Sequence, residues 1–339
     1  MPSLLARFSG FTRGTAPARC LAALSALVCI GSASAADLPT IRVGWTIPNE
    51  ETKYLMMKRP ELFPDLGTKY QVDWKQLQGT SPMVQGMLAG ALDCATLAPI
   101  PMAQGAERNG LKAYIVAQHS EESPGNFSIY WGVREDSPIR SAADLKGKTI
   151  ATNAIGSGVY YNLLLWLKKQ NLDPEKDVRI VEVSFAAMDT AVRTGKVDAA
   201  PFVQPFAGRA QDAGGIRKLF SLSEVQSPLV HIFEGCEKGF SDKNPELVRL
   251  YIRDLTKAMD ILKKDRSLAV DVNVEVMRAP RPALDRYVFT DQDMGHTDGS
   301  APRLDVIAQS FALYREAGFI TKPLSIDDFV RRDLLAPIR

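Results

Sequence analysis

Two loops carry hydroxyl groups and glycines in an arrangement that suits the recognition of an anion. Residues 78–82 (QGTSP) and 153–158 (NAIGSG) each precede an apolar helical pattern, and the first loop predicts Ser81 as N-cap with Pro82 as first helical residue. The first turn of a helix presents unpaired N–H groups and partial positive charge, so it can bind an acceptor-rich group without arginine. We therefore expect Thr80, Ser81, Ser157 and Gly158 to contribute to a ligand site.

A simpler interpretation is that each serine only caps its own helix. One loop alone does not decide between capping and binding. Two such loops in separate parts of the chain favour a shared cleft into which both helix starts point.

Catalytic and metal sites have little support in the residue spacing. The three histidines, His119, His231 and His296, lie far apart, and no H-E-x-x-H or C-x-x-C sequence offers a metal site. Residues 156–158 lack the spacing of a nucleophile elbow, and the chain has no phosphate loop or dinucleotide fingerprint. We can name no nucleophile, base and orienting group together, so we predict no catalytic residue, no metal and no cofactor, unless residues distant in sequence cluster in space.

Short β-rich runs alternate with helical patterns and predict parallel βαβ units. The expected strands are 41–46, 71–74, 94–97 and 113–117, and the pattern restarts with 127–133, 149–152, 178–183 and 197–201. The expected helices are 51–62, 82–90, 100–109, 158–170, 186–195 and 204–213. A return strand at 229–234 precedes helices at 245–263, 266–277 and 303–317, the first with Asn244 as N-cap. Two α/β lobes are the expected result.

Open α/β sheets bind ligands beyond the carboxyl ends of their strands, and several polar or aromatic residues occupy such positions. Trp45 could instead belong to the core, and His119 and His231 could be structural histidines with satisfied hydrogen bonds. The pairs Glu50–Glu51 and Glu121–Glu122 are expected on solvated faces, although one of these glutamates in the cleft would suit a ligand ammonium. The strand-end candidates are Trp45, Thr46, Ala98, Pro99, His119, Gln204 and Pro205, with His231 on the return strand.

An internal sequence repeat, here called the internal echo, supports two related lobes. Residues 83–95 match residues 188–200 at a constant offset of 105, with Gly90 aligned to Gly195 and Asp93 to Asp198. In each copy a helix would end at a glycine with a left-handed backbone, and the aspartate would lead into a buried strand. The alternative is that such junctions look alike in any α/β protein.

The N-terminal residues have the order of a secretory signal peptide. Three arginines and no acidic residue precede an apolar run at 20–30, and Ala33-Ser34-Ala35 predicts cleavage after Ala35. The apolar run is too short to span a bilayer. Removal of residues 1–35 takes three of the 41 basic residues and none of the 39 acidic ones, which leaves a formal net charge of −1. The composition thus gives no sign of nucleic-acid binding, and we expect a periplasmic protein that does not itself span the membrane.

The stretch 134–150 (REDSPIRSAADLKGKTI) resembles the opening of the second lobe in the periplasmic binding proteins of the nitrate, sulfonate and taurine class of ABC transporters, which includes thiamine-precursor binders. The two glycine–aspartate junctions at 90–93 and 195–198 and the helix start at 244–248 resemble the same family. The resemblance covers essentially the whole mature chain. It is specific for the family and weak for the ligand.

The resemblance implies the type II periplasmic-binding-protein fold, in which two α/β lobes joined by two crossing strands enclose a ligand cleft. Residues 1–35 would be the signal peptide, 36–122 and 233–339 lobe 1, and 123–232 lobe 2. Gln204 replaces the acidic residue that many relatives carry before the proline, which argues against a ligand amine. The fold would also bring Cys94 next to Cys236 at the end of the sheet remote from the cleft, where they would form a disulfide or remain two buried thiols.

The leading hypothesis is a transport receptor. It would capture a small polar, anionic ligand such as a sulfonate, nitrate or carboxylate and deliver it to an ABC permease with its ATPase. The alternative is an enzyme on the same fold that acts on a thiamine-precursor-like or other small metabolite. A periplasmic sensor subunit is a third interpretation.

Overall fold

The structure is a computed structural model that describes residues 38–335. The predicted signal peptide lies outside the described residues. Within them, no helix combines the length and the apolar character needed to cross a bilayer.

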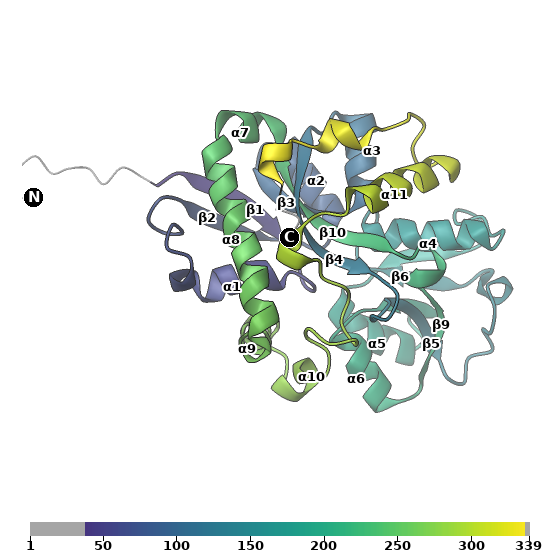
Figure 1. Cartoon of the computed structure of the whole chain (residues 1–339). Coiled ribbons are helices and arrows are strands. Elements are labelled where there is room, and N and C mark those ends of the chain that lie inside the picture. Colours follow the sequence, from purple (N-terminus) through teal and green to yellow (C-terminus); the bar gives the residue numbers. More distant parts are fainter. Residues whose placement is uncertain (1–37, 336–339) are drawn as a thin grey trace, which may run out of the picture. The chain divides into compact units, whose positions relative to one another are not determined.

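Two five-stranded mixed sheets organise these residues (Figure 1). The first sheet has the order β2-β1-β3-β10-β4 and the second the order β7-β6-β8-β5-β9. In each, one strand runs antiparallel to its neighbours, β10 in the first sheet and β5 in the second. The strands are β1 (Thr40–Trp45), β2 (Gln71–Gln76), β3 (Cys94–Leu97), β4 (Ala113–Glu122), β5 (Tyr130–Arg134), β6 (Thr149–Thr152), β7 (Arg179–Glu182), β8 (Ala199–Phe202), β9 (Ile216–Ser221) and β10 (Leu229–Glu237).

We call the elements around the first sheet lobe 1 and those around the second sheet lobe 2. The chain passes between the sheets twice, from β4 to β5 and from β9 to β10. The α-helices are α1 (Glu51–Lys58), α2 (Thr80–Leu88), α3 (Pro99–Asn109), α4 (Gly158–Lys169), α5 (Phe185–Arg193), α6 (Phe206–Ala213), α7 (Lys238–Lys243), α8 (Pro245–Lys264), α9 (Arg266–Met277), α10 (Arg281–Asp285) and α11 (Leu304–Glu316). The predicted boundaries at 122/123 and 232/233 remain predictions.

Helices cover both faces of each sheet because successive strand residues point to opposite sides. In lobe 1, Cys94 packs into the core beneath α1, α8 and α9, whereas Ala95 packs into the core shared with α2 and α3. In lobe 2, Ala199 faces the apolar side of α4, and Ala200 faces α5 and α6. The core beneath α2, α3 and α4 includes residues of both lobes.

The internal echo is a structural repeat. Gly90 and Gly195 both have positive φ angles, 68° and 71°, which glycine adopts without steric cost. Asp93 accepts a hydrogen bond from the Arg42 N–H at 2.8 Å, and Asp198 accepts one from the Thr149 N–H at 2.8 Å. Since the strand orders also correspond, the prediction that two lobes share one architecture is confirmed.

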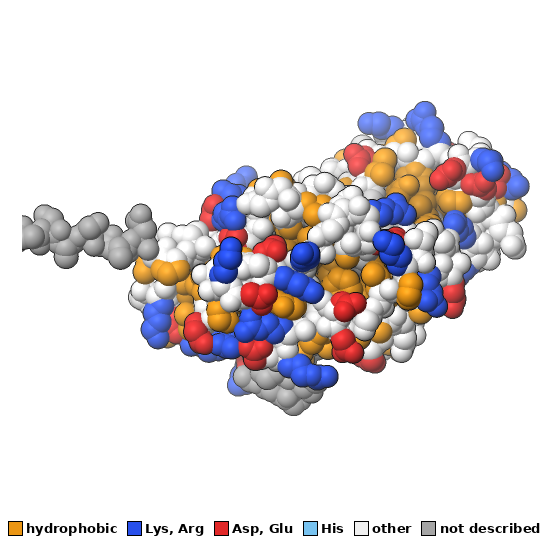
Figure 2. All heavy atoms as spheres, turned by 90° about the horizontal axis from the view of Figure 1, so that it is seen from above, with side chains coloured by type: hydrophobic (Ala, Val, Ile, Leu, Met, Phe, Trp, Pro, Cys, Tyr) orange, Lys and Arg blue, Asp and Glu red, His pale blue; other side chains and the backbone are white. Residues whose placement is uncertain are grey.

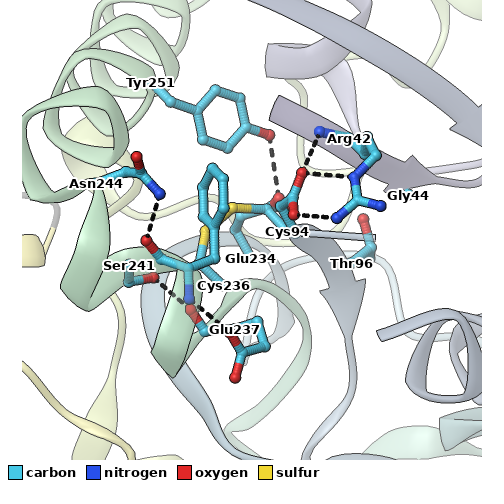
Figure 3. The surroundings of a disulfide bond; sticks show 12 residues. Arg42, Gly44, Cys94, Thr96, Glu234, Cys236, Glu237, Ser241, Asn244 and Tyr251 are labelled. Atoms are coloured by element: carbon cyan, nitrogen blue, oxygen red, sulfur yellow. Dashed lines mark hydrogen bonds and ion pairs between the residues drawn. A yellow bond between two sulfur atoms is a disulfide. The ribbon is translucent and has the colours of Figure 1, made fainter. Parts of the chain in front are cut away.

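A disulfide joins β3 to β10 in lobe 1. Cys94 and Cys236 are register partners on these antiparallel strands, with Cα atoms 4.0 Å apart and an S–S distance of 2.02 Å. Figure 3 shows the bond beside Glu234, whose carboxylate accepts from Tyr251. Cys94 begins β3 and Ala98 follows its other end, so the disulfide and the strand-end candidate occupy opposite ends of the strand.

Several local predictions differ from the structure in detail. Helix α2 begins at Thr80 with Gly79 at the cap position, so Ser81 and Pro82 lie inside the helix and Ser81 is not the N-cap. Asn244 holds the cap position of α8, but its side chain donates to the Phe240 carbonyl. The expected helix 51–62 ends at Lys58 and continues after a break as a 3₁₀ turn.

The two glutamate pairs expected on solvated faces are buried. Glu50, Glu51 and Glu122 are at most 2% exposed, and Glu121 is 8% exposed. On the face seen in Figure 2, basic and acidic side chains are interspersed and form no large patch of a single charge. The interactions of Glu50 and Glu51 inside lobe 1 are described below.

Candidate functional site

A small cavity of about 30 Å³ lies between the lobes, at the ends of several strands. We call it the inner cavity. In this closed arrangement of the lobes it has room for a small polar head group and not for a drug-sized molecule. Lobe 1 lines it with Thr46, Ile47, Pro48, Asn49, Gly79, Thr80 and Ala98, lobe 2 with Asn153, Ser157, Gly158, Val159, Phe185 and Val203, and β10 with His231 and Ile232.

The starts of α2 and α4 meet across this cavity. The Gly158 N–H donates to Thr80 Oγ1 at 3.3 Å, so the first turn of α4 is joined to the first turn of α2. A Cβ atom on Gly158 would lie 2.8 Å from the Ala98 Cβ, which is closer than real Cβ contacts allow. Glycine at position 158 is therefore what allows the two lobes to approach here.

Ser157 caps its own helix, as the simpler interpretation proposed. Its Oγ accepts from the Tyr160 N–H at 3.3 Å and donates to Asn153 Oδ1 at 2.9 Å. Both bonds are local to lobe 2. The capping role fixes the loop around Gly158, so capping and binding do not exclude each other.

Lobe 1 holds Thr46 from three directions. The Thr46 N–H donates to Glu50 Oε1 at 3.0 Å, and its carbonyl accepts from the Tyr54 hydroxyl at 3.0 Å. Its own Oγ1 accepts from the Gly79 N–H at 3.4 Å. Both backbone groups of Thr46 are therefore hydrogen-bonded within lobe 1, and its side chain lines the cavity.

A fully buried ionic network supports Thr46 from behind. Lys53 Nζ lies 2.7 Å from Glu234 Oε2 and 3.1 Å from Glu50 Oε2, and all three side chains are 0% exposed. It also donates to the Gly44 carbonyl and to Thr96 Oγ1. Although burial raises the pKa of Glu234, Lys53 and His119 outweigh it and hold that pKa below its ordinary value. None of these charged groups lines the inner cavity.

A second buried cluster joins α1 to the chain before α11. His296 Nδ1 contacts the His119 carbonyl at 2.8 Å, and His296 Nε2 lies 3.5 Å from Asp293 Oδ2. Burial lowers the pKa of His296, but Asp293 and Glu51 outweigh it and raise it to about 9. Burial raises the pKa of Glu51 to about 7. This cluster also lies outside the lining of the inner cavity.

His231 is the titratable group of the inner cavity. It lies at a register shift of β10 and is 8% exposed, and no partner is found for its Nδ1 among the described residues. Burial lowers its pKa to about 4, so its ring is neutral at pH 7. A neutral imidazole supplies one donor and one acceptor.

The structure brings half of the predicted binding residues together. Those that line the inner cavity are Thr46, Thr80, Ala98, Ser157, Gly158 and His231. Asn49, Asn153, Phe185, Val203 and Ile232 were not among the candidates. Phe185 and Val203 follow strands β7 and β8, so the rule that ligands bind beyond strand ends would have selected them.

The other candidates lie outside the inner cavity. Trp45 packs edge-on against Tyr54 with ring centroids 6.0 Å apart, in agreement with the core interpretation. His119 contacts Glu234 at 3.0 Å as a structural histidine. Gln204 is buried and donates to the Gln292 carbonyl. Ser81 and Pro99 are the second and first residues of their helices, and Pro205 lines a neighbouring chamber.

The cavity hydroxyls are not arranged as nucleophiles. Thr46 and Thr80 bond to backbone groups and Ser157 to its own helix and to Asn153, so no described histidine or carboxylate contacts them. The two cysteines from position 38 onward are joined in the disulfide. Among residues 38–335, no group of three or more His, Cys, Asp or Glu side chains is placed to hold a metal ion.

Comparison with known proteins gives a consistent result. The model of the family described as "ABC transporter, phosphonate, periplasmic substrate-binding protein" matches residues 47–230, more than half of the chain. The chain is 21% identical to a putative aliphatic sulfonates-binding protein of Escherichia coli, over 79% of this chain and 81% of that protein.

Solved structures support the same fold. The alkanesulfonate-binding protein SsuA of Xanthomonas axonopodis pv. citri, solved with bound MOPS, is 19% identical with a TM-score of 0.68, over 88% of this chain and 99% of that chain. The desulfurization enzyme DSZB is 15% identical with a TM-score of 0.62, over 87% and 97% of the two chains. At these identities the likeness concerns the fold alone, which both a binding protein and an enzyme share.

Proposed function

The chain belongs to the periplasmic substrate-binding proteins of ABC transporters, in the phosphonate family, and from this we propose that it captures a small oxyanion in the inner cavity. It is the substrate-binding component of an ABC importer. The proposed ligand carries a sulfonate, phosphonate or similar acceptor-rich head, and the proposed destination is a permease with its ATPase. Residues 1–35 would direct export and be removed after Ala35.

The observation that carries this proposal is the pair of helix starts that meet at an uncharged cavity. Thr80 and Gly158 bring the positive ends of α2 and α4 together. No Lys, Arg, Asp or Glu lines the inner cavity. The positive helix ends can therefore attract an oxyanion without a competing ion pair. The Gly158 N–H, which donates to Thr80 Oγ1 in this structure, would donate to the ligand instead, while Ile47, Val159 and Phe185 can contact its apolar part.

The contacts between the lobes support capture by closure. The Gly158–Thr80 bond and the Ala98–Gly158 approach both exist only when the lobes are together. A ligand between them would be shielded from water, and hinge closure around ligands is common in periplasmic binding proteins. The closed form is also the one that a permease would distinguish from the free receptor.

Calorimetry with a panel of one-headed anions tests the proposal. Propanesulfonate, propylphosphonate, nitrate and butyrate are titrated into the mature protein, and we expect saturable binding of the sulfonate or the phosphonate. The recovered ligand should be chemically unchanged, since the transport role requires release rather than turnover. Absence of binding for every member, or conversion of a bound member, would contradict the proposed function.

A further inference from the structure

A second, larger chamber opens next to the inner cavity. It has a volume of about 350 Å³, and we call it the outer chamber. Thr46, Ile47 and Phe185 line both spaces, so the two are neighbours across these side chains. Both lobes contribute to its wall, α6 from lobe 2 and the end of α9 from lobe 1.

The outer chamber is positively charged, in contrast to the inner cavity. Arg209 on α6 and Arg278 after α9 line it, and no Asp, Glu or Lys does. Neither guanidinium has a carboxylate partner among the residues from 38 to 335, whereas the nearby Arg286 pairs with Asp212 and Arg59 with Glu275. Arg209 lies over the Phe206 ring, 4.9 Å from its centroid. Both side chains are exposed, and guanidinium groups without a carboxylate partner are suited to bind an oxyanion.

The backbone at Arg278 gives an independent reason to assign it a function. It ends α9 with φ 52° and ψ 36°, in the left-handed region where helices usually place glycine. A residue with a Cβ is disfavoured there, and such outliers concentrate at functional sites. Glycine would adopt this backbone conformation at lower cost. A role in the outer chamber would account for the presence of an arginine side chain at this position.

We propose that the outer chamber is a second anion subsite, and that the natural ligand is a short, two-ended anion with an oxyanion at each end. This proposal rests on the proposed function, because the first end occupies the inner cavity. The second end, a carboxylate or another oxyanion, contacts Arg209 and Arg278. Since these arginines belong to different lobes, the second end also joins the lobes. Sulfo- and phosphono-carboxylates are the corresponding chemical class.

Matched pairs of ligands test the second subsite. Calorimetry compares 3-sulfopropionate with propanesulfonate, 3-phosphonopropionate with propylphosphonate, and succinate with butyrate. For the head that binds, the two-ended member should bind about tenfold more tightly than its one-ended partner. Arg209→Gln and Arg278→Gln should each lower the affinity for the two-ended ligand about fivefold and leave that for the one-ended ligand unchanged.

Two variants separate a subsite from other effects. Arg140→Gln removes the same charge from an exposed arginine that lines neither space, and it should leave all affinities unchanged. Arg278→Gly places glycine at the left-handed backbone position, where it has no steric cost. The melting temperature of this variant should therefore equal or exceed that of the wild type, while its affinity for the two-ended ligand falls. That combination is not expected of an arginine with a merely structural role.

The outcomes also separate this proposal from the one on which it rests. If one-ended ligands bind as tightly as two-ended ones, or if Arg140→Gln weakens binding as much as Arg209→Gln, the second subsite is wrong and the proposed function stands. If none of the six ligands binds, the proposed function fails and the second subsite fails with it.

Discussion

Helices α1 and α4 occupy equivalent places in the two lobes, and their interiors differ in kind. Each follows the second strand in its sheet order, β1 or β6, and precedes the parallel edge strand beside it, β2 or β7. Helix α1 buries charge, with Lys53 among carboxylates, whereas α4 buries Leu163 and Trp166 against the lobe 2 core. Trp166 stacks on Phe220 with centroids 3.6 Å apart. One architecture therefore accepts an ionic or an apolar interior at the same position.

The difference shows how lobe 1 can support an uncharged cavity with charged residues. The Lys53 network holds Thr46 through Glu50, and the charges compensate one another behind the cavity wall. Lobe 2 reaches the same cavity through a backbone loop fixed by the Ser157 cap. Substitutions should consequently act on stability in α1 and on binding in the loop before α4.

The largest expected effect is the loss of the buried cation in α1. Lys53→Met leaves Glu50 and Glu234 buried without it, and breaking a buried ion pair typically costs about 3–5 kcal/mol of unfolding free energy. The control is Lys169→Met in α4, which removes an exposed lysine that donates to the Val225 carbonyl and should cost less than about 1 kcal/mol. Urea unfolding measures both. Equal losses would remove the distinction between the two helices.

An intermediate effect is expected from the histidine of the cavity. The pKa of His231 is about 4 in the folded state against 6.5 for the free side chain, so its folded state resists protonation. Its contribution to stability is complete above pH 6.5 and is lost as the pH falls toward 4, by up to about 3 kcal/mol. Glu51, with its pKa raised to about 7, acts in the opposite direction in this range, so the difference between proteins is the relevant quantity.

His231→Leu should therefore lose less unfolding free energy than the wild type between pH 7 and pH 4. Urea unfolding at the two pH values gives the difference for each protein. Parallel losses in the two proteins would show that His231 does not change its proton binding on folding.

Much of the fold follows from local pattern in the sequence. The strands at Cys94–Leu97 and Thr149–Thr152 and the helix Arg266–Met277 have the predicted bounds, since buried apolar runs and caps define them locally. Strand β9 was missed, and the burial of Glu50 and Glu51 was predicted wrongly. Both depend on partners distant in the sequence, β5 for the strand and Glu234 or His296 for the charges that surround the glutamates.

The candidate site was predictable in its loops and less so in its side chains. Glycines and hydroxyls before helices identified Thr80, Ser157 and Gly158, because helix starts have a local signature. The sequence could not show that Trp45 turns to the core and Val203 to the cavity. Side-chain direction at a strand end depends on the pleat and on the neighbouring lobe, and neither is encoded in a short motif.

The smallest expected effects concern the loop before α4, where one change adds bulk and the other removes a hydroxyl. Gly158→Val places a side chain against Ala98, so the lobes cannot approach as closely and affinity for the ligand should fall about tenfold or more. Ser157→Ala removes a cap that is worth about 0.5–2 kcal/mol of stability and leaves Gly158 unchanged. Its affinity should change less than that of Gly158→Val. Calorimetry with the tightest ligand of the panel, on variants with native circular dichroism spectra, ranks the two. Wild-type affinity in Gly158→Val would place the ligand away from the meeting point of α2 and α4, and a greater loss in Ser157→Ala would show that the hydroxyl itself binds the ligand.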